Sequence, residues 1–379
     1  MTELRGQLLL GGALVPGRLT FEGGRITAVE SEDARGEDLP VISPGFIELH
    51  IHGFAGCDPL IDLVGMSRGL ARAGTTAFQP TLFPRAPELL GADAAACWAA
   101  AGKNPADAAE VIGLHLEGPF VNPLSAGALP AEDLATPSVA GLRAILGPAT
   151  GDGNGVRTMT IAPELSASPD LIEELVRSGV RASLGHSLAG MADVRSAARA
   201  GATGATHLFN AMGGVHHRDM GLAGMALIER TIFAEIIGDL NHVKREAFEL
   251  ALAARGPEGL CLVSDALEAA GTGCDVFHSH GRDHVIQDGT AYFRMTADSE
   301  LQLAGSASSQ LEMVRKLVGE GVTSLAEALT MASTTPARAL GIDAEVGQIA
   351  VGARADRIVL SARGLALERV FVRGAELDA

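Results

Sequence analysis

Short apolar runs of strand length recur along the middle of the chain. Eight of them can be counted, at residues 46–50, 76–79, 111–116, 159–162, 181–184, 204–208, 233–237 and 260–264. Most gaps between them carry the apolar–polar spacing of a helix, as in 169–179, 191–201 and 243–255. Strands that alternate with helices in this way predict an α/β fold, a (β/α)8 TIM-type barrel. The alternative is an open doubly wound sheet, which the lack of a G-x-G-x-x-G after the first run disfavours.

The two ends of the chain have a different pattern. Residues 4–30 alternate short β-like runs with glycine-rich turns. Similar runs return near the other end, at residues 348–350, 357–360 and 369–372. Both ends therefore predict strands of one small β-sandwich domain, with the long middle inserted between them. The predicted boundaries are 1–44 with 344–379 for the small β domain and 45–343 for the barrel.

Composition limits the classes of partner. The 379 residues include 29 Lys and Arg against 46 Asp and Glu, which gives a net charge of −17 at pH 7. Such a charge argues against binding of duplex DNA and of anionic membranes, and one Trp with one Tyr offers little surface for stacking bases. No apolar run approaches the roughly 18 residues that span a bilayer. Four scattered cysteines without a C-x-x-C pair fit a reducing cytoplasm.

Polar residues with metal-binding side chains stand where five of the predicted strands end. They are His50 and His52, Glu117, His186, His207 and Asp265. The C-terminal ends of the strands in a (β/α)8 barrel meet at one face, which carries the active site. Imidazole and carboxylate are the ligands that zinc or iron prefers. A single histidine of this kind is more often a hydrogen-bonded core residue, but five such strand ends together predict a metal site.

Five segments around these residues resemble a known family. They read His50-x-His52, Leu116-Glu117-Gly118-Pro119-Phe120, Gly185-His186-Ser187, His207-Leu208-Phe209-Asn210-Ala211-Met212 and Ser264-Asp265-Ala266. They are similar to segments of the amidohydrolase superfamily, and in detail to its N-acetylglucosamine-6-phosphate deacetylase family. The resemblance covers nearly the whole chain in the expected order, and the E-G-P-F and H-L-F-N-A-M segments together are highly specific.

The resemblance implies a divalent metal, zinc or iron, with one or two ions per subunit. Glu117, His186 and His207 would be the ligands of the principal ion. His50 and His52, with Glu117 bridging, would hold a second ion. Glu117 occupies the place at which many related amidohydrolases carry a carboxylated lysine.

The implied reaction is hydrolysis of N-acetylglucosamine 6-phosphate to glucosamine 6-phosphate and acetate. Asp265 would accept a proton from the attacking water and then donate it to the departing amine. The structural alternative for Asp265 is the N-cap of a helix after the eighth strand.

The resemblance also implies how the sugar phosphate is held. Asn210 and Ala211 would line its site, and Arg218 matches the family's phosphate arginine, whose planar fork suits phosphate oxygens. His242 matches a histidine that is contributed across a dimer interface, so a homodimer is expected.

Three features depart from the family pattern or are not explained by it. Leu129 stands where some relatives carry a histidine that contacts the acetyl oxygen. The segment His278–His284 carries three histidines and is either a solvated loop or a flap near the active-site mouth. His115 lies two residues before Glu117, so it should point inward, either beside the ligands or into the packing.

Several functions are consistent with these residues. The first is the deacetylase of N-acetylglucosamine 6-phosphate, and its nearest alternative is the N-acetylgalactosamine 6-phosphate enzyme. A deacylase of N-acyl amino acids is a more distant alternative, against which Arg218 and His242 argue. Outside the enzymes, the chain could be a catalytically dead scaffold that binds a partner, which the complete ligand set with Asp265 disfavours.

Overall fold

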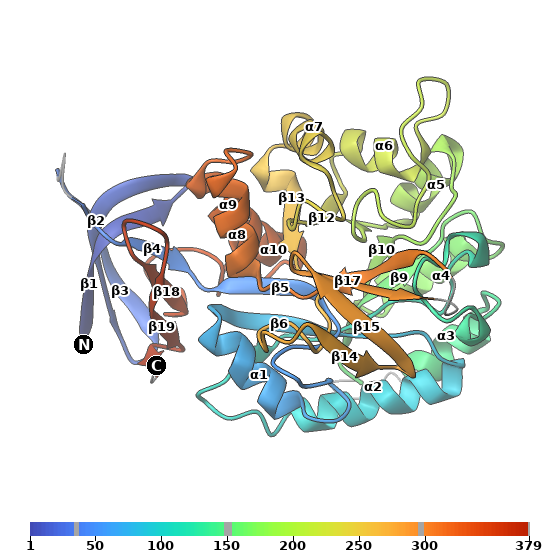
Figure 1. Cartoon of the computed structure of the whole chain (residues 1–379), viewed down its shortest axis with the longest axis horizontal. Coiled ribbons are helices and arrows are strands. Elements are labelled where there is room, and N and C mark those ends of the chain that lie inside the picture. Colours follow the sequence, from blue (N-terminus) through green and yellow to red (C-terminus); the bar gives the residue numbers. More distant parts are fainter. Residues whose placement is uncertain (34–37, 148–153, 295–298, 378–379) are drawn as a thin grey trace.

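A parallel eight-stranded barrel forms the larger part of the protein. The computed structural model describes residues 1–33, 38–147, 154–294 and 299–377 (Figure 1). In their order around the barrel, the strands are β5 (Phe46–Ile51), β6 (Thr75–Leu82), β8 (Leu114–Leu116), β9 (Val156–Ile161), β10 (Arg181–Leu184), β11 (Gly204–Ala205), β12 (Phe233–Ile237) and β13 (Leu260–Val263), with the short β7 (Glu110–Val111) beside β6. Each strand overlaps one of the eight predicted ranges, although β5, β6 and β9 extend beyond theirs, and the barrel is confirmed.

Helices follow most of the strands and pack against the barrel. They are α1 (Leu63–Arg72), α2 (Pro87–Ala101), α3 (Val139–Leu146), α4 (Ser168–Arg177), α5 (Met191–Ala200), α6 (Gly221–Ile228), α7 (Arg245–Arg255), α8 (Gln310–Gly319), α9 (Leu325–Ala332) and α10 (Thr334–Ala339). In α4, for example, Leu171, Ile172 and Leu175 are buried, and their spacing places them on one side of the helix. None of the helices in the described part of the chain has the length and apolar content that a bilayer crossing requires.

The barrel closes between its first and last strands with little backbone pairing. Within the described residues no ladder joins β5 to β13, and a single parallel bridge links Ile51 to Ala266. The backbone N–H of Asp265 donates to the carbonyl of His50 at 3.0 Å. The N–H groups of His52 and Gly53 also donate to the Ala266 carbonyl, at 2.9 and 3.0 Å, so the backbone pairing lies at the rim. Side chains link the two strands below it.

The buried amide of Gln310, the first residue of α8, links the two strands of the seam. Its Nε2 donates to the carbonyl of Ile47 in β5 at 3.2 Å and to that of Leu262 in β13 at 2.9 Å. Its Oε1 accepts a hydrogen bond from the Thr75 hydroxyl at 3.1 Å. One side chain thus ties β5, β6 and β13 together at the point where the ladder is missing.

Strands from both ends of the chain form one small sheet. Its order is β20 (Ala375–Glu376), β19 (Leu367–Val372), β18 (Arg357–Leu360), β4 (Val41–Pro44), β1 (Thr2–Leu10), β2 (Ala13–Glu22) and β3 (Arg25–Ser31). Figure 1 shows both marked termini in this sheet, at one end of the molecule. The prediction that the two ends build a common β domain is confirmed.

This seven-stranded sheet curls until its two ends face each other. The rings of Phe21 in β2 and Phe371 in β19 lie 5.2 Å apart, although three strands separate β2 from β19 in the sheet. The curl encloses an apolar cluster in the manner of a sandwich. The strand predicted at 348–350 is wrong, because Ile349 packs into that cluster without joining a ladder. The boundaries at 44/45 and 343/344 stay predictions.

A four-stranded antiparallel sheet follows β13, and we call it the flap. It consists of β14 (Val276–Ser279), β15 (Arg282–Gln287), β16 (Thr290–Arg294) and β17 (Leu301–Ser306). The Ser306 N–H donates to the Asp265 carbonyl at 2.9 Å, and the Leu267 N–H donates to the Ser306 carbonyl at 3.0 Å. The end of the flap is therefore fastened to the segment that carries Asp265.

Candidate metal centre

Five buried side chains converge beyond the C-terminal ends of the barrel strands. Glu117 Oε1 lies 2.9 Å from His207 Nε2, 3.1 Å from His186 Nε2 and 3.3 Å from His50 Nε2. Glu117 Oε2 lies 3.3 Å from His52 Nε2. His50 and His52 present their Nε2 atoms to each other at 3.2 Å, as expected for two rings on the same side of one strand. The structure thus brings together all five residues proposed from the sequence as ligands.

Asp265 approaches the same group of side chains from the end of β13. Its Oδ1 lies 3.4 Å from His50 Nε2 and 3.5 Å from His52 Nε2. Burial would raise the pKa of the Asp265 carboxyl, but the charge of His50 and the hydrogen bond with His52 hold it below its ordinary value. The element that follows in the described stretch is β14 at Val276, so the alternative role of Asp265 as a helix N-cap is wrong.

The chemistry of this donor set fits a cation. His186 Nδ1 lies 3.1 Å from the Ser125 carbonyl, so in a neutral ring Nδ1 carries the hydrogen and Nε2 presents a lone pair. That lone pair faces Glu117 Oε1, and His207 Nε2 lies 3.0 Å from His186 Nε2. Electron-rich atoms this close repel one another unless protons or a positive ion lie between them. Two imidazoles and a carboxylate are a common ligand set for zinc.

Three of these residues have strained backbones. The φ angles of His186, His207 and Asp265 are 47°, 30° and 49°, in the left-handed region that residues with a Cβ avoid. Such positions cost about 1–3 kcal/mol each and gather at functional sites, where the surrounding structure holds them. The strain indicates that the surrounding structure holds these three side chains in fixed positions.

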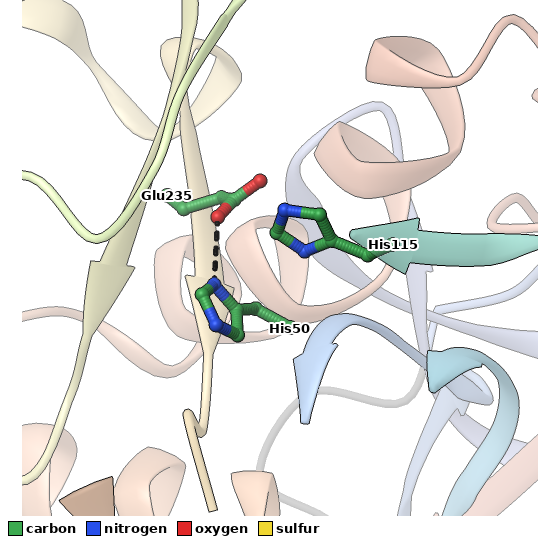
Figure 2. A group of neighbouring side chains, drawn as sticks. All are labelled: His50, His115 and Glu235. Atoms are coloured by element: carbon green, nitrogen blue, oxygen red, sulfur yellow. Dashed lines mark hydrogen bonds and ion pairs between the residues drawn. The ribbon is translucent and has the colours of Figure 1, made fainter. Parts of the chain in front are cut away.

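Glu235 orients His50 through the ring nitrogen Nδ1, which faces away from Glu117. This role of Glu235 was not predicted from the sequence. Figure 2 shows its carboxylate beside the ring, and Glu235 Oε2 lies 3.3 Å from His50 Nδ1. The guanidinium of Arg181 lies 3.4 Å from Glu235 Oε1. Burial raises the pKa of Glu235, but the hydrogen bond from His50 and the nearby charges, Arg181 among them, lower it to about 2. When His50 is neutral, as a metal ligand must be, Nδ1 donates to this carboxylate and the lone pair of Nε2 points toward Glu117.

His115 points inward, as predicted, and lies beside His50 (Figure 2). Its Nδ1 donates to the Leu49 carbonyl at 3.2 Å, and its Nε2 lies 2.8 Å from the Thr160 hydroxyl. Burial, together with the charge of His50, lowers the pKa of His115 to about 3, so the ring is neutral. Since both nitrogens have protein partners, His115 supports the ligands and is not one of them.

Glu48 spans the barrel seam directly beneath the centre. Its carboxyl accepts hydrogen bonds from the N–H of His50 at 3.1 Å and from the N–H of Ser264 at 3.0 Å. Burial raises the pKa of Glu48 to about 8. Its role was not predicted from the sequence, although an acidic residue within an apolar run could have indicated it. Both Glu48 and Glu235 are acidic residues inside otherwise apolar strand runs, where a charge needs a specific partner.

Comparison with known proteins identifies the family. The model of the amidohydrolase family matches residues 41–377. The N-acetylglucosamine-6-phosphate deacetylase of Homo sapiens is 35% identical over 377 residues, which cover 96% of this chain and 89% of that one. The chain belongs to the amidohydrolase family, and within it to the N-acetylglucosamine-6-phosphate deacetylase family. The family implies a divalent metal, and the centre contains groups able to bind one.

Other members of the family support this assignment. The N-acetylgalactosamine-6-phosphate deacetylase of Escherichia coli O157:H7 is 31% identical and aligns with 94% of this chain and 93% of its own length. The N-acetyl-D-glucosamine-6-phosphate deacetylase of Mycobacterium smegmatis, solved in complex with N-acetyl-D-glucosamine-6-phosphate, has a TM-score of 0.88 at 29% identity and covers 100% of this chain and 99% of its own. The Thermotoga maritima enzyme gives a TM-score of 0.88 at 26% identity, with 99% of both chains covered.

Two of the residues expected at the substrate lie directly beside the ligands of this amidohydrolase centre. The Asn210 amide donates to the carbonyls of His207 and Leu208, both at 3.3 Å, so its position is tied to that of a ligand. The carbonyl of Ala211 accepts a hydrogen bond from Ser125 at 2.7 Å. Both residues are half-buried.

The two cationic candidates for the phosphate differ in their surroundings. Arg218 is exposed, and its Nη1 lies 2.8 Å from His217 Nε2. His242 is buried within its own chain, with Nδ1 2.7 Å from Asp239 Oδ2. Burial lowers the pKa of His242, but the Asp239 carboxylate outweighs it and raises the value above the ordinary one. The Asp239 carboxylate therefore favours the protonated form of His242, whereas Arg218 contacts His217 at the surface.

A cavity of about 610 Å³ opens beside His52. Phe83 stacks on the His52 ring, with the centroids 3.9 Å apart and the planes 6° apart, and His280 of the flap meets Phe83 edge-on at 4.6 Å. Arg282 donates to the carbonyl of Ala128 at 3.3 Å, which fastens the β14–β15 hairpin across the opening. The segment His278–His284 is therefore part of the flap and borders this cavity, in agreement with one of the two interpretations of the sequence.

Proposed function

We propose that the protein hydrolyses N-acetylglucosamine 6-phosphate to glucosamine 6-phosphate and acetate. The observation that supports this most directly is the convergence of Glu117, four histidines and Asp265 at the active-site face of the barrel. The chain is a hydrolase of the amidohydrolase family, and relatives that carry this activity in their names are 35% and 33% identical to it. The four cysteines, all free thiols, support a cytoplasmic location.

We assign Glu117, His186 and His207 to one metal ion, and His50 and His52, with Glu117 shared, to a second. The carboxylate of Glu117 reaches both groups of ligands, since Oε1 faces His186 and His207 and also lies 3.3 Å from His50 Nε2, while Oε2 faces His52. Zinc or iron suits these ligands. A divalent ion at this centre would lower the pKa of a bound water toward about 7 and polarise the acetyl carbonyl.

Asp265 is the proposed general acid and base. Its lowered pKa keeps the carboxylate charged near neutral pH, in the form that accepts a proton. Oδ1 lies within 3.5 Å of both His50 and His52, so the carboxylate can reach a water held at the proposed metal centre. As the C–N bond breaks, the same carboxyl returns the proton to the nitrogen, so that the leaving group departs as a neutral amine.

The 6-phosphate is assigned to Arg218 and His242, with Asn210 and Ala211 lining the sugar. Asp239 favours the positively charged form of His242, and Arg218 can supply a bidentate fork. The working assembly is proposed to be a homodimer, which light scattering after size-exclusion chromatography would test. Acidic residues dominate the rest of the molecule, so these cations form a local exception.

The test is a substrate panel on protein whose metal content has been measured. N-acetylglucosamine 6-phosphate should release acetate, and unphosphorylated N-acetylglucosamine should have a much higher KM. N-acetylgalactosamine 6-phosphate is the second candidate, because one relative at 31% identity is named for it. Metal-loaded protein that releases acetate from neither phosphosugar would overturn the proposal.

A further inference from the structure

The cavity beside His52 lies across the barrel rim from Arg218, one of the residues proposed for the phosphate. Its walls come from the flap and from the loops that follow β5, β6 and β8. Arg218 follows β11 and His242 follows β12. In the ring of eight strands, β6 and β11 stand four places apart, which is half a turn. The loop that carries Arg218 therefore lies opposite the cavity across the candidate centre. His242 lies nearer the flap, because its neighbour Asn241 donates to Thr290 of β16 at 2.9 Å.

This arrangement sets the direction in which an amide substrate points. The proposed function places the phosphate near Arg218 and His242 and the amide carbon at the centre. The sugar then runs from the amide nitrogen toward β11 and β12. The acyl chain leaves the carbonyl carbon on the other side, toward His52 and the cavity. An acetyl group ends after one methyl, which leaves most of the 610 Å³ beyond it.

The walls suit an apolar chain. They include Phe83, Pro130, Leu267 and Phe293, of which Leu267 and Phe293 are buried. Several charged groups of the lining are engaged with one another or with an aromatic ring. Arg85 pairs with Asp93 at 2.6 Å, His280 lies 3.9 Å from Asp58, and Arg282 lies over the Phe293 ring at 4.8 Å from its centroid.

We propose that this enzyme also hydrolyses N-acyl amino-sugar 6-phosphates whose acyl chains are longer than acetyl, from three to about six carbons. The inference rests on the proposed function and names a wider substrate class for the same centre. Water adds its oxygen to the acyl carbon, the C–N bond breaks, and the proton goes to the amine, so the products are a short-chain carboxylate and the amino-sugar phosphate. The acidic residues that also line the cavity, among them Glu132 and Asp133, argue against an anionic occupant.

The experiment measures kcat/KM for glucosamine 6-phosphate carrying acetyl, propanoyl, butanoyl and hexanoyl groups. Each methylene that enters the cavity should raise kcat/KM by up to about fourfold, so the butanoyl substrate should equal or exceed the acetyl one. A fall of more than tenfold from acetyl to butanoyl would overturn the inference. Failure with the acetyl substrate as well would instead count against the proposed function.

A pair of variants on β17 locates the effect. Ala304 lines the cavity, so Ala304→Phe should remove activity on the butanoyl and hexanoyl substrates while activity on the acetyl substrate stays within about twofold. Its neighbour Leu303 is partly exposed and does not line the cavity, so Leu303→Phe is the matched control and should change neither. If Ala304→Phe lost activity equally on substrates of every acyl length, the acyl group would lie outside this cavity. Acceptance of 1-O-butyl substrates together with rejection of N-butanoyl ones would assign the cavity to the anomeric substituent and also refute the proposal.

Discussion

The barrel seam offers the sharpest test of how this fold holds its site. Replacing Gln310 by methionine keeps the length and flexibility of the side chain but removes its amide. The carbonyls of Ile47 and Leu262 then lose a donor, and the Thr75 hydroxyl loses its acceptor. A buried polar group left without its partner costs about 1–3 kcal/mol. With three such groups, Gln310→Met should lower the free energy of unfolding by about 3 kcal/mol or more.

The measurement combines urea denaturation with hydrogen exchange. Far-UV circular dichroism gives the change in unfolding free energy, and mass spectrometry of peptides covering 46–51 and 260–264 should show faster exchange in the variant. Gln302→Met, at an exposed position of β17, is the control and should stay within about 0.5 kcal/mol of the parent. A loss below 1 kcal/mol with unchanged exchange in β5 and β13 would show that the amide of Gln310 does not close the barrel.

Four further predictions concern the site. Asp265→Asn should retain the bound metal while kcat falls by about 10²–10⁴-fold; a loss of less than tenfold would refute its role as acid and base. Arg218→Ala should raise KM for the 6-phosphate substrate and leave an unphosphorylated analogue nearly unaffected, whereas equal losses on both would contradict the assignment. Removal of the metal by a chelator should abolish acetate release and lower the thermal midpoint, because the facing lone pairs then repel; added zinc should restore both. The pKa of His242 is raised in the folded state, so its pairing with Asp239 stabilises the fold fully below about pH 6.5, and this stabilisation is lost as the pH rises through the raised value. Asp239→Asn should therefore be more destabilising at pH 6 than at pH 9, as measured by urea denaturation midpoints.

The barrel and its candidate ligands were accessible from the sequence for a clear reason. Parallel strands are buried on both faces, so each reads as a nearly continuous apolar run, and the polar residue that ends it marks the rim. The predicted strand at 348–350 failed because the burial of Ile349 comes from packing without a ladder. An apolar run in the sequence predicts that a segment is buried. It predicts a β-strand correctly only where a neighbouring strand is present to pair with that segment.

Contacts between distant segments could not be predicted in this way. Gln310 reaches the seam from a helix that begins far along the chain from Ile47, and no local pattern marks it. Glu235 and Glu48 had a usable signal as charges within apolar runs, but their partners follow only from the closed barrel. The cavity beside His52 depends on where the flap returns, which periodicity does not encode.

The curled sheet built from both ends of the chain has a consequence for biosynthesis. A ribosome adds about 5–20 residues per second, so the roughly 310 residues between Pro44 and Arg357 take about 15–60 s to emerge. For that time Phe21 lacks its partner Phe371, and the free edge of β4 lacks β18. The first strands to be translated are thus among the last to be completed. A nascent chain halted before Arg357 should therefore expose an apolar surface that a ribosome-associated chaperone can bind.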